Sequence, residues 1–183
     1  MDWEVIELQT PLQDESVSAL RAGQKVLLSG IVYTARDAAH RRMHESMQLG
    51  QKLPIDLRGQ VLYYVGPTPA FGEHIIGSAG PTTALRMDRY TPDLYALGVK
   101  ATIGKGNRTQ PVIDAIQQHR AVYFAALGGI GALLSKKIKS VTVVAYEDLG
   151  AEAIHCLEFD KFPLIVINDA EGNDYYRMVR ERT

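Results

Sequence analysis

Short apolar runs rich in β-branched residues alternate along this chain with segments of helical periodicity. Strands are expected at residues 3–8, 25–35, 60–66, 99–104, 121–126 and 138–146. Helices are expected at residues 14–23, 36–50 and 91–98, and further helices are expected to begin near Pro81, Asn107 and Leu127. This alternation predicts an α/β or α+β fold around a mainly buried sheet. Because Pro163 has no N–H for a sheet ladder, the tail, residues 156–169, is expected to form two edge strands.

Length and composition are those of an ordinary globular chain. The 183 residues suffice for one domain, and no repeat or linker divides them, so we expect a single domain over residues 1–183. The net charge of −1 gives nucleic-acid binding no support. The first residues carry acids where a signal peptide needs basic and then apolar residues, and no apolar run is long enough for a membrane span. We therefore expect a cytoplasmic chain.

The segment GPTTALRMD, at residues 80–88, has the composition of an anion-binding helix start. Pro81 suits the first helical position, because it has no N–H to lose there. The amides of Thr82 and Thr83 would then point outward with the positive end of the helix dipole. Arg86 follows Thr82 by four residues and would project from the same face of the helix. These features predict a site for a carboxylate or a phosphate.

A second segment, GKGNR at residues 104–108, supplies a further cation. Lys105 stands between two glycines, which allow a backbone to approach a ligand closely, and its ammonium acts as a compact positive charge. Taken with the segment before it, this loop predicts a site for a small, doubly charged anion.

Three apparent motifs lack the spacing or a residue that their function requires. GGIGA, at residues 128–132, lacks the dinucleotide pattern and favours close helix packing, and residues 98–105 lack the Ser or Thr of a phosphate loop. His40 and His44 are four residues apart, as in zinc proteases, but the glutamate that should follow the first histidine is missing. We therefore predict no metal ligands in this chain, and we expect His44 on an exposed helix face.

Cys156 is the only cysteine. One thiol makes no intrachain disulfide and cannot supply the three or four thiolates that hold an iron–sulfur cluster. We interpret it as a small hydrophobic residue in a strand.

The two loop segments and TARDAAHRRM, at residues 34–43, resemble the C-terminal domain of class I iron–sulfur fumarases. In two-subunit members, as in L(+)-tartrate dehydratase, this domain is a separate β chain. The match continues through LLSG, LRGQVLYYVGPT and GNDYY, at residues 27–30, 57–68 and 172–176. The resemblance implies a swivelling β/β/α fold. It also implies a [4Fe–4S] cluster, which a partner α subunit must hold because this chain has one cysteine.

The resemblance also assigns roles to residues. It implies that Arg36, Arg86 and Lys105 bind the two substrate carboxylates and that Thr82 is the catalytic base. A second group of residues surrounds this site and could orient it: Asp37, His40, Thr83 and Asn107. An arginine fork binds a carboxylate bidentately and stabilises the negative charge that develops as a neighbouring proton leaves. A threonine hydroxyl, by contrast, is a weak acid and needs activation to serve as a base.

Two functional hypotheses follow. The first is the β subunit of a [4Fe–4S]-dependent hydro-lyase acting on a C4 dicarboxylate, with fumarate and malate first, tartrate second and methyl-branched relatives still open. Its partners would be an α subunit, in a hetero-oligomer, and the small dicarboxylate. The alternative is a non-catalytic anion-binding or assembly module. A decayed module is expected to have lost one of Arg36, Thr82, Arg86 and Lys105, and this chain keeps all four, which favours the enzyme.

Overall fold

The computed structural model describes residues 5–70, 72, 75–126 and 131–182. The strands within these ranges form one mixed sheet. Its parallel part consists of β1 (Val5–Gln9), β2 (Lys25–Thr34), β3 (Val61–Tyr63), β4 (Ala101–Gly104) and β5 (Val122–Ala125). Its antiparallel part consists of β6 (Ile138–Ala145) and β7 (Ile154–Asn168). The predicted mixed α/β class is confirmed.

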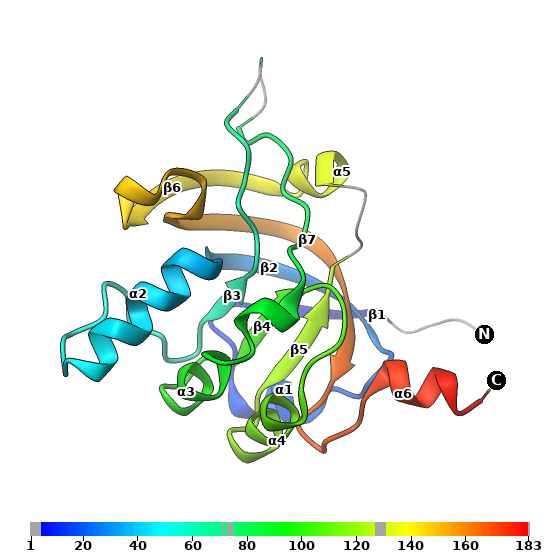
Figure 1. Cartoon of the computed structure of the whole chain (residues 1–183). Coiled ribbons are helices and arrows are strands. Elements are labelled where there is room, and N and C mark those ends of the chain that lie inside the picture. Colours follow the sequence, from blue (N-terminus) through cyan, green and yellow to red (C-terminus); the bar gives the residue numbers. More distant parts are fainter. Residues whose placement is uncertain (1–4, 71, 73–74, 127–130, 183) are drawn as a thin grey trace.

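The long strand β7 closes the sheet on itself. From β2 the hydrogen-bonded neighbours are β3, β4, β5 and β7 in turn, and β7 pairs again with β2. Figure 1 shows β7 curving from β6 to the side of β5. The prediction of two edge strands at residues 156–169 is therefore wrong. Lys161, with φ of 49°, bends the chain without ending the strand, and Pro163 lies opposite Leu27 in the ladder with β2.

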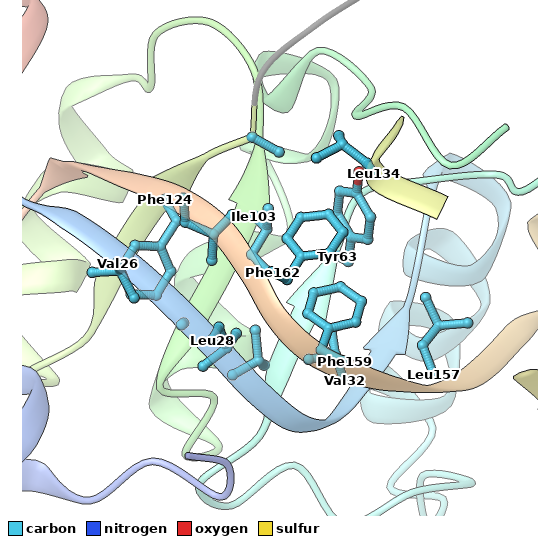
Figure 2. Close-up of a cluster of buried hydrophobic side chains, with 14 of the residues drawn as sticks. Val26, Leu28, Val32, Tyr63, Ile103, Phe124, Leu134, Leu157, Phe159 and Phe162 are labelled. Atoms are coloured by element: carbon cyan, nitrogen blue, oxygen red, sulfur yellow. The ribbon is translucent and has the colours of Figure 1, made fainter. Parts of the chain in front are cut away.

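The space enclosed by these strands holds one half of the hydrophobic core. Alternate residues point inward, as the period of two in a strand requires: examples are Val26 and Leu28 on β2 and Phe124 on β5. Figure 2 shows the aromatic centre of this cluster, where Phe159 and Phe162 stack at 4.0 Å and Tyr63 meets them edge to face. The aromatic packing ties β3 to the two halves of β7.

The other half of the core lies between the outer side of the sheet and the helices. The helical elements are α1 (Asp14–Ser18), α2 (Asp37–Gln48), α3 (Thr91–Ala96), α4 (Gln110–Gln118), α5 (Gly131–Ser135), α6 (Tyr175–Arg180) and the 3-10 helices η1 (Ala84–Met87) and η2 (Glu147–Glu152). Met43 from α2, Tyr95 from α3 and Ile116 from α4 pack on the outward residues Leu62 and Tyr123. In Figure 1 these three helices lie on the same side of the molecule.

None of the helices in the described ranges has the length and apolar character that crossing a membrane requires.

The predicted helix at Pro81 is wrong. Residues 81–83 are extended, and only a short 3-10 helix, η1, follows. The amide of Thr82 donates to the carbonyl of Tyr64 at 2.6 Å, so the amide that we expected to face a ligand bonds the end of β3 instead. Two further differences concern helices. Helix α1 ends at Ser18 rather than near Gly23, and the C-terminal helix α6 was not predicted from the sequence. The helix expected from Leu127 begins, in the described residues, at Gly131.

Candidate anion-binding site

The candidate site lies where parallel strands end. Because β2, β3 and β4 are parallel, their carboxyl ends meet at one edge of the sheet. Arg36 follows β2, and Lys105 follows β4 directly. This edge is the usual position of ligand sites in parallel α/β sheets.

Main-chain hydrogen bonds bring the two predicted loop segments together. Thr83 and Lys105 form a parallel bridge, in which the Lys105 amide donates to Thr82 O at 3.2 Å and the Ala84 amide donates to Lys105 O at 2.9 Å. The side chain of Thr82 is half-buried, whereas Thr83, Lys105 and Asn107 are exposed. The structure therefore joins the segments as the sequence predicts, but through a β bridge instead of a helix start.

Asp37 gathers the two arginines of the predicted site. Arg86 Nε donates a hydrogen bond to Asp37 Oδ1 at 3.0 Å, and Arg86 Nη2 lies 2.9 Å from Asp37 Oδ2 as an ion pair. Arg36, which precedes α2, approaches the same carboxylate with Nη2 at 3.8 Å. Asp37 thus occupies the Nε and Nη2 side of the Arg86 fork, and this side chain remains about half exposed, at 52%. The Nη1 end of Arg86 makes no hydrogen bond within the described chain, which leaves it available to a ligand.

Glu152, in η2, is a member of the cluster that sequence reasoning missed. Its Oε1 lies 3.7 Å from Arg36 Nε, and η2 also contacts α2 through a two-bond pair between Arg42 and Asp148. Nothing in the sequence indicates this contact, because it depends on how the β6–β7 hairpin folds back onto α2. Glu152 lowers the positive charge around Arg36.

The cluster keeps an excess of positive charge. Arg36, Arg86 and Lys105 are cations, and Asp37 and Glu152 are the carboxylates beside them, so three minus two leaves a charge of +1. No carboxylate of the described residues lies within 4.0 Å of the Lys105 ammonium, which is exposed. The net charge of these residues therefore favours an anion over a cation.

His40 is hydrogen-bonded to the main chain of Arg36. The ring is fully buried against Tyr64 and Tyr90, and its Nδ1 lies 2.9 Å from the carbonyl oxygen of Arg36, which also accepts the His40 amide. Burial lowers the pKa of His40 to about 4, so the ring is neutral near pH 7 and donates Nδ1–H to that carbonyl. His40 thus fixes the backbone that carries Arg36.

His44 is partly exposed, and its Nδ1 lies 3.6 Å from Asp93 Oδ2. Among the described residues, no group of histidines, cysteines and carboxylates could hold a metal ion.

This burial predicts a pH dependence of stability. The pKa of His40 is lowered in the folded chain, so the unfolded chain binds more protons between pH 6.5 and pH 4, and stability is lost as the pH falls through that window. Relative to a His40→Gln variant, we expect the wild-type free energy of unfolding to fall by about 2 kcal/mol more between pH 7 and pH 5. Urea denaturation at both pH values measures this difference. His44→Gln is the control and should keep the wild-type slope; a His40→Gln variant with that slope would contradict the buried neutral ring.

A second charged residue of the loop, Arg108, points inward. Its side chain is completely buried, and it forms an ion pair with the nearly buried Asp88, Nε to Oδ1 at 2.8 Å. The sequence analysis includes Arg108 in the GKGNR motif but predicts no role for it. Asp88, the last residue of the GPTTALRMD motif, has the opposite charge, so the sequence did offer a partner for Arg108. The pair lies beneath the exposed cations.

The two glycines of this loop serve different purposes. A Cβ at Gly104 would lie 2.9 Å from the Tyr64 ring and 3.1 Å from Ala84 Cβ, so glycine is needed there for packing rather than for a ligand. Gly106 has φ of 83°, a conformation that other residues adopt at a cost, and space around it is open. The loop therefore turns at Gly106 just after it presents Lys105.

An apolar hollow borders the cluster. Its volume is about 430 Å³, and its lining includes Pro67, Ile76, Val143, Ala151 and His155. None of the described residues that line it carries a carboxylate, a lysine or an arginine, so this part of the chain brings no charge to the hollow for a dicarboxylate. The exposed cations at the strand ends remain the better anion site.

Comparison with known proteins fits this arrangement. The family model described as fumarase C-terminus matches residues 2–179. The chain belongs to the fumarase C-terminal family. Of the residues to which the resemblance assigns roles, Arg36, Asp37 and Arg86 are in side-chain contact, and the segments that carry Thr82 and Lys105 are joined through their main chains.

Relatives of this fumarase C-terminal chain fall into two length classes. Fumarate hydratase 2 of Leishmania major is 38% identical over 93% of this chain and 31% of the relative, and the aerobic class I fumarate hydratase of Escherichia coli is 35% identical over 96% and 33%. The chain thus spans about a third of those proteins. A protein named as an L(+)-tartrate dehydratase subunit beta, from Methanocaldococcus jannaschii, is 36% identical over 93% of this chain and 91% of its own length.

Proposed function

We propose that this chain is the β subunit of a hydro-lyase that reversibly adds water to a four-carbon dicarboxylate, with fumarate and L-malate as the first substrates. The observation that carries the proposal is the cluster of Arg36, Arg86 and Lys105 at the carboxyl ends of β2 and β4. The names of the relatives, two of them fumarate hydratases, point to the same chemistry. The swivelling β/β/α description of the fold belongs to this proposal.

The cations act on the carboxylates of the substrate. Arg86 offers the end of its fork that Asp37 leaves open, and Arg36 lies beside it, so one substrate carboxylate binds there. Lys105 binds the second carboxylate as a point charge. When a proton leaves the carbon next to a carboxylate, negative charge builds up on that carboxylate, and the arginines stabilise it.

Thr82 is the residue that we propose as the base. The carbonyl of Thr82 accepts a hydrogen bond from the Lys105 amide, so the two residues lie on adjacent segments. A Lys105 ammonium directed toward the Thr82 hydroxyl would lower the cost of removing its proton. The helix dipole no longer contributes, because no helix begins at Pro81. A carboxylate of the partner subunit would carry the proton onward.

The [4Fe–4S] cluster that the resemblance implies does not fit the residues of this chain. Cys156, the single cysteine, is half-buried in β7, and burial raises the pKa of its thiol. We therefore assign the cluster to an α subunit, in a hetero-oligomer with this chain. The relative whose name includes "subunit beta" shares nearly its whole length with this chain, which supports a separate partner.

Tartrate is the second candidate substrate, and the same relative favours it, since its name gives a tartrate dehydratase. Fumarate, tartrate and methyl-branched acids differ in one hydroxyl or methyl group and share both carboxylates. A panel of these acids, tested with the two-chain complex, ranks them by kcat/KM. A non-catalytic anion-binding module would bind several of them and turn over none.

Arg86→Lys tests the proposal directly. The variant keeps the charge but loses the fork that engages Asp37 and the substrate together, so we expect a loss of about 2–4 kcal/mol in kcat/KM for L-malate with the two-chain complex. Arg41→Lys is the matched control, because Arg41 is exposed on α2 and pairs only loosely with Glu45, at 4.0 Å. Near-normal kinetics of Arg86→Lys would remove Arg86 from the substrate site.

A further inference from the structure

Beneath the exposed cations lies a buried polar layer, which we define as Tyr64, Asp88, Arg108 and Tyr123. Arg108 is its centre. Besides the bond to Asp88, its Nη1 donates to Thr102 Oγ1 at 3.1 Å, its Nη2 donates to Thr91 Oγ1 at 2.9 Å, and both approach the Tyr64 hydroxyl. All the N–H groups of the guanidinium therefore have an acceptor, which is the condition for burying it.

The layer joins the two segments that carry the exposed cations. Asp88 directly follows η1, which carries Arg86, and Arg108 lies three residues beyond Lys105. The second oxygen of Asp88 accepts the Thr109 amide at 2.6 Å, so this carboxylate holds the 104–109 loop through both side chain and backbone. Arg86 and Lys105 thus stand on the outer side of two segments that are fastened together from within.

Tyr123 holds the loop at the position next to Lys105. Its hydroxyl donates to the Gly106 carbonyl at 2.9 Å, and its ring lies 4.8 Å from the Arg108 guanidinium carbon. Gly106 is also the residue at which the backbone turns. The Tyr123 hydroxyl therefore adds a side-chain anchor at Gly106 to the main-chain bonds that hold Lys105.

We propose that this buried layer sets the separation between the Arg86 and Lys105 charges and so makes the site selective for four-carbon dicarboxylates over three- and five-carbon ones. The inference rests on the proposed function, because it requires that the two cations bind opposite carboxylates. Adding or removing one methylene moves the second carboxylate by about 1 Å, the advance of one carbon–carbon bond. A loop that cannot shift rejects that displacement, whereas a loosened loop accommodates it. A buried ion pair adds little net stability compared with apolar packing, which agrees with a positional role for Asp88 and Arg108.

The test uses the two-chain complex and measures competitive inhibition constants of malonate, succinate and glutarate against L-malate. The wild type should prefer succinate. Tyr123→Phe keeps the ring and removes only the bond to Gly106, so we expect the preference for succinate over glutarate to fall about fivefold, the equivalent of one net hydrogen bond. Tyr63→Phe is the matched control: this buried hydroxyl donates to the Ala79 carbonyl, and the ring belongs to the core inside the sheet rather than to the buried polar layer, so the preference should be unchanged.

A second variant, Arg108→Lys, keeps the charge opposite Asp88 and loses the fork, so it should relax the preference further if it folds. A purely structural effect would lower the active fraction and leave the ratio of inhibition constants unchanged. A wild-type ratio in Tyr123→Phe, or equal relaxation in Tyr63→Phe, would overturn the inference while leaving the proposed function intact. If no dicarboxylate competes and L-malate is not turned over, the proposed function fails, and the inference falls with it.

Discussion

Purified alone, this chain is expected to be folded and colourless and to leave L-malate unchanged, and mixing it anaerobically with an iron-loaded α subunit should produce activity where neither chain has any. The expectation follows from the single cysteine, which cannot hold a cluster, and from the proposed site, which offers cations and a hydroxyl but no iron ligands. This chain spans about a third of the length of the fumarate hydratase relatives, which is consistent with the proposal that further residues outside it take part in the reaction. Fumarate absorbance measures the reaction in both directions.

Three controls define this experiment. The α subunit alone, the iron-free α subunit with this chain, and the loaded α subunit with a variant lacking both site arginines, Arg36→Met with Arg86→Met, should all be inactive. Turnover of L-malate by the isolated chain without iron would refute the division of labour between the chains. Activity of the double variant would show that the cations described here do not bind the substrate.

The alternation of strands and helices was enough to predict the fold class. Each of the six strands predicted before the tail has a counterpart in the structure, and β2 (Lys25–Thr34) ends within one residue of its predicted limit. The tail was predicted wrongly because Pro163 suggested an edge, whereas β7 bends at Lys161 and accepts partners on both sides. Closure of a sheet depends on contacts between distant residues, and local patterns do not report them.

The motifs identified residues that come together in the candidate site, but they did not predict the main-chain structure that carries those residues. Arg36, Asp37 and Arg86 come together as the motifs indicate, and Lys105 lies on the segment that bridges to Thr83. The helix start at Pro81 failed because a local preference for helix lost to main-chain bonds with the ends of β3 and β4, which only the folded sheet provides.

The parts that sequence reasoning missed share one property: they act through tertiary contacts. Glu152 reaches Arg36 from η2, and the pairing of Arg108 with Asp88 joins two motifs that were considered separately. A charged residue within a binding motif is easily interpreted as a ligand contact. Arg108 is completely buried and pairs with Asp88, so it faces the protein interior instead.

Removing the hydroxyl of Thr82 is expected to lower kcat of the two-chain complex about 10²–10⁴-fold, the range for a positioned acid–base group, with little change in KM. Thr82→Val keeps nearly the same shape, and the main-chain bonds of this residue to Tyr64 and Lys105 do not involve the side chain. Lys105→Met should raise KM as well, because the ammonium binds a carboxylate in the ground state and in the transition state alike. Steady-state kinetics and solvent-deuterium exchange into L-malate provide the measurement, since exchange reports proton removal directly.

Thr83→Val is the internal control for this prediction. Thr83 is exposed and adjacent in the chain, but in an extended segment successive side chains point to opposite sides, so its hydroxyl should face away from the position of Thr82. Its variant is expected to have near-normal kcat and normal exchange. If Thr82→Val exchanged deuterium at the wild-type rate and Thr83→Val did not, the base would be Thr83. If both exchanged normally, the base would lie on the partner subunit, and this chain would act as a carboxylate clamp whose geometry is set by Asp37 and Arg108.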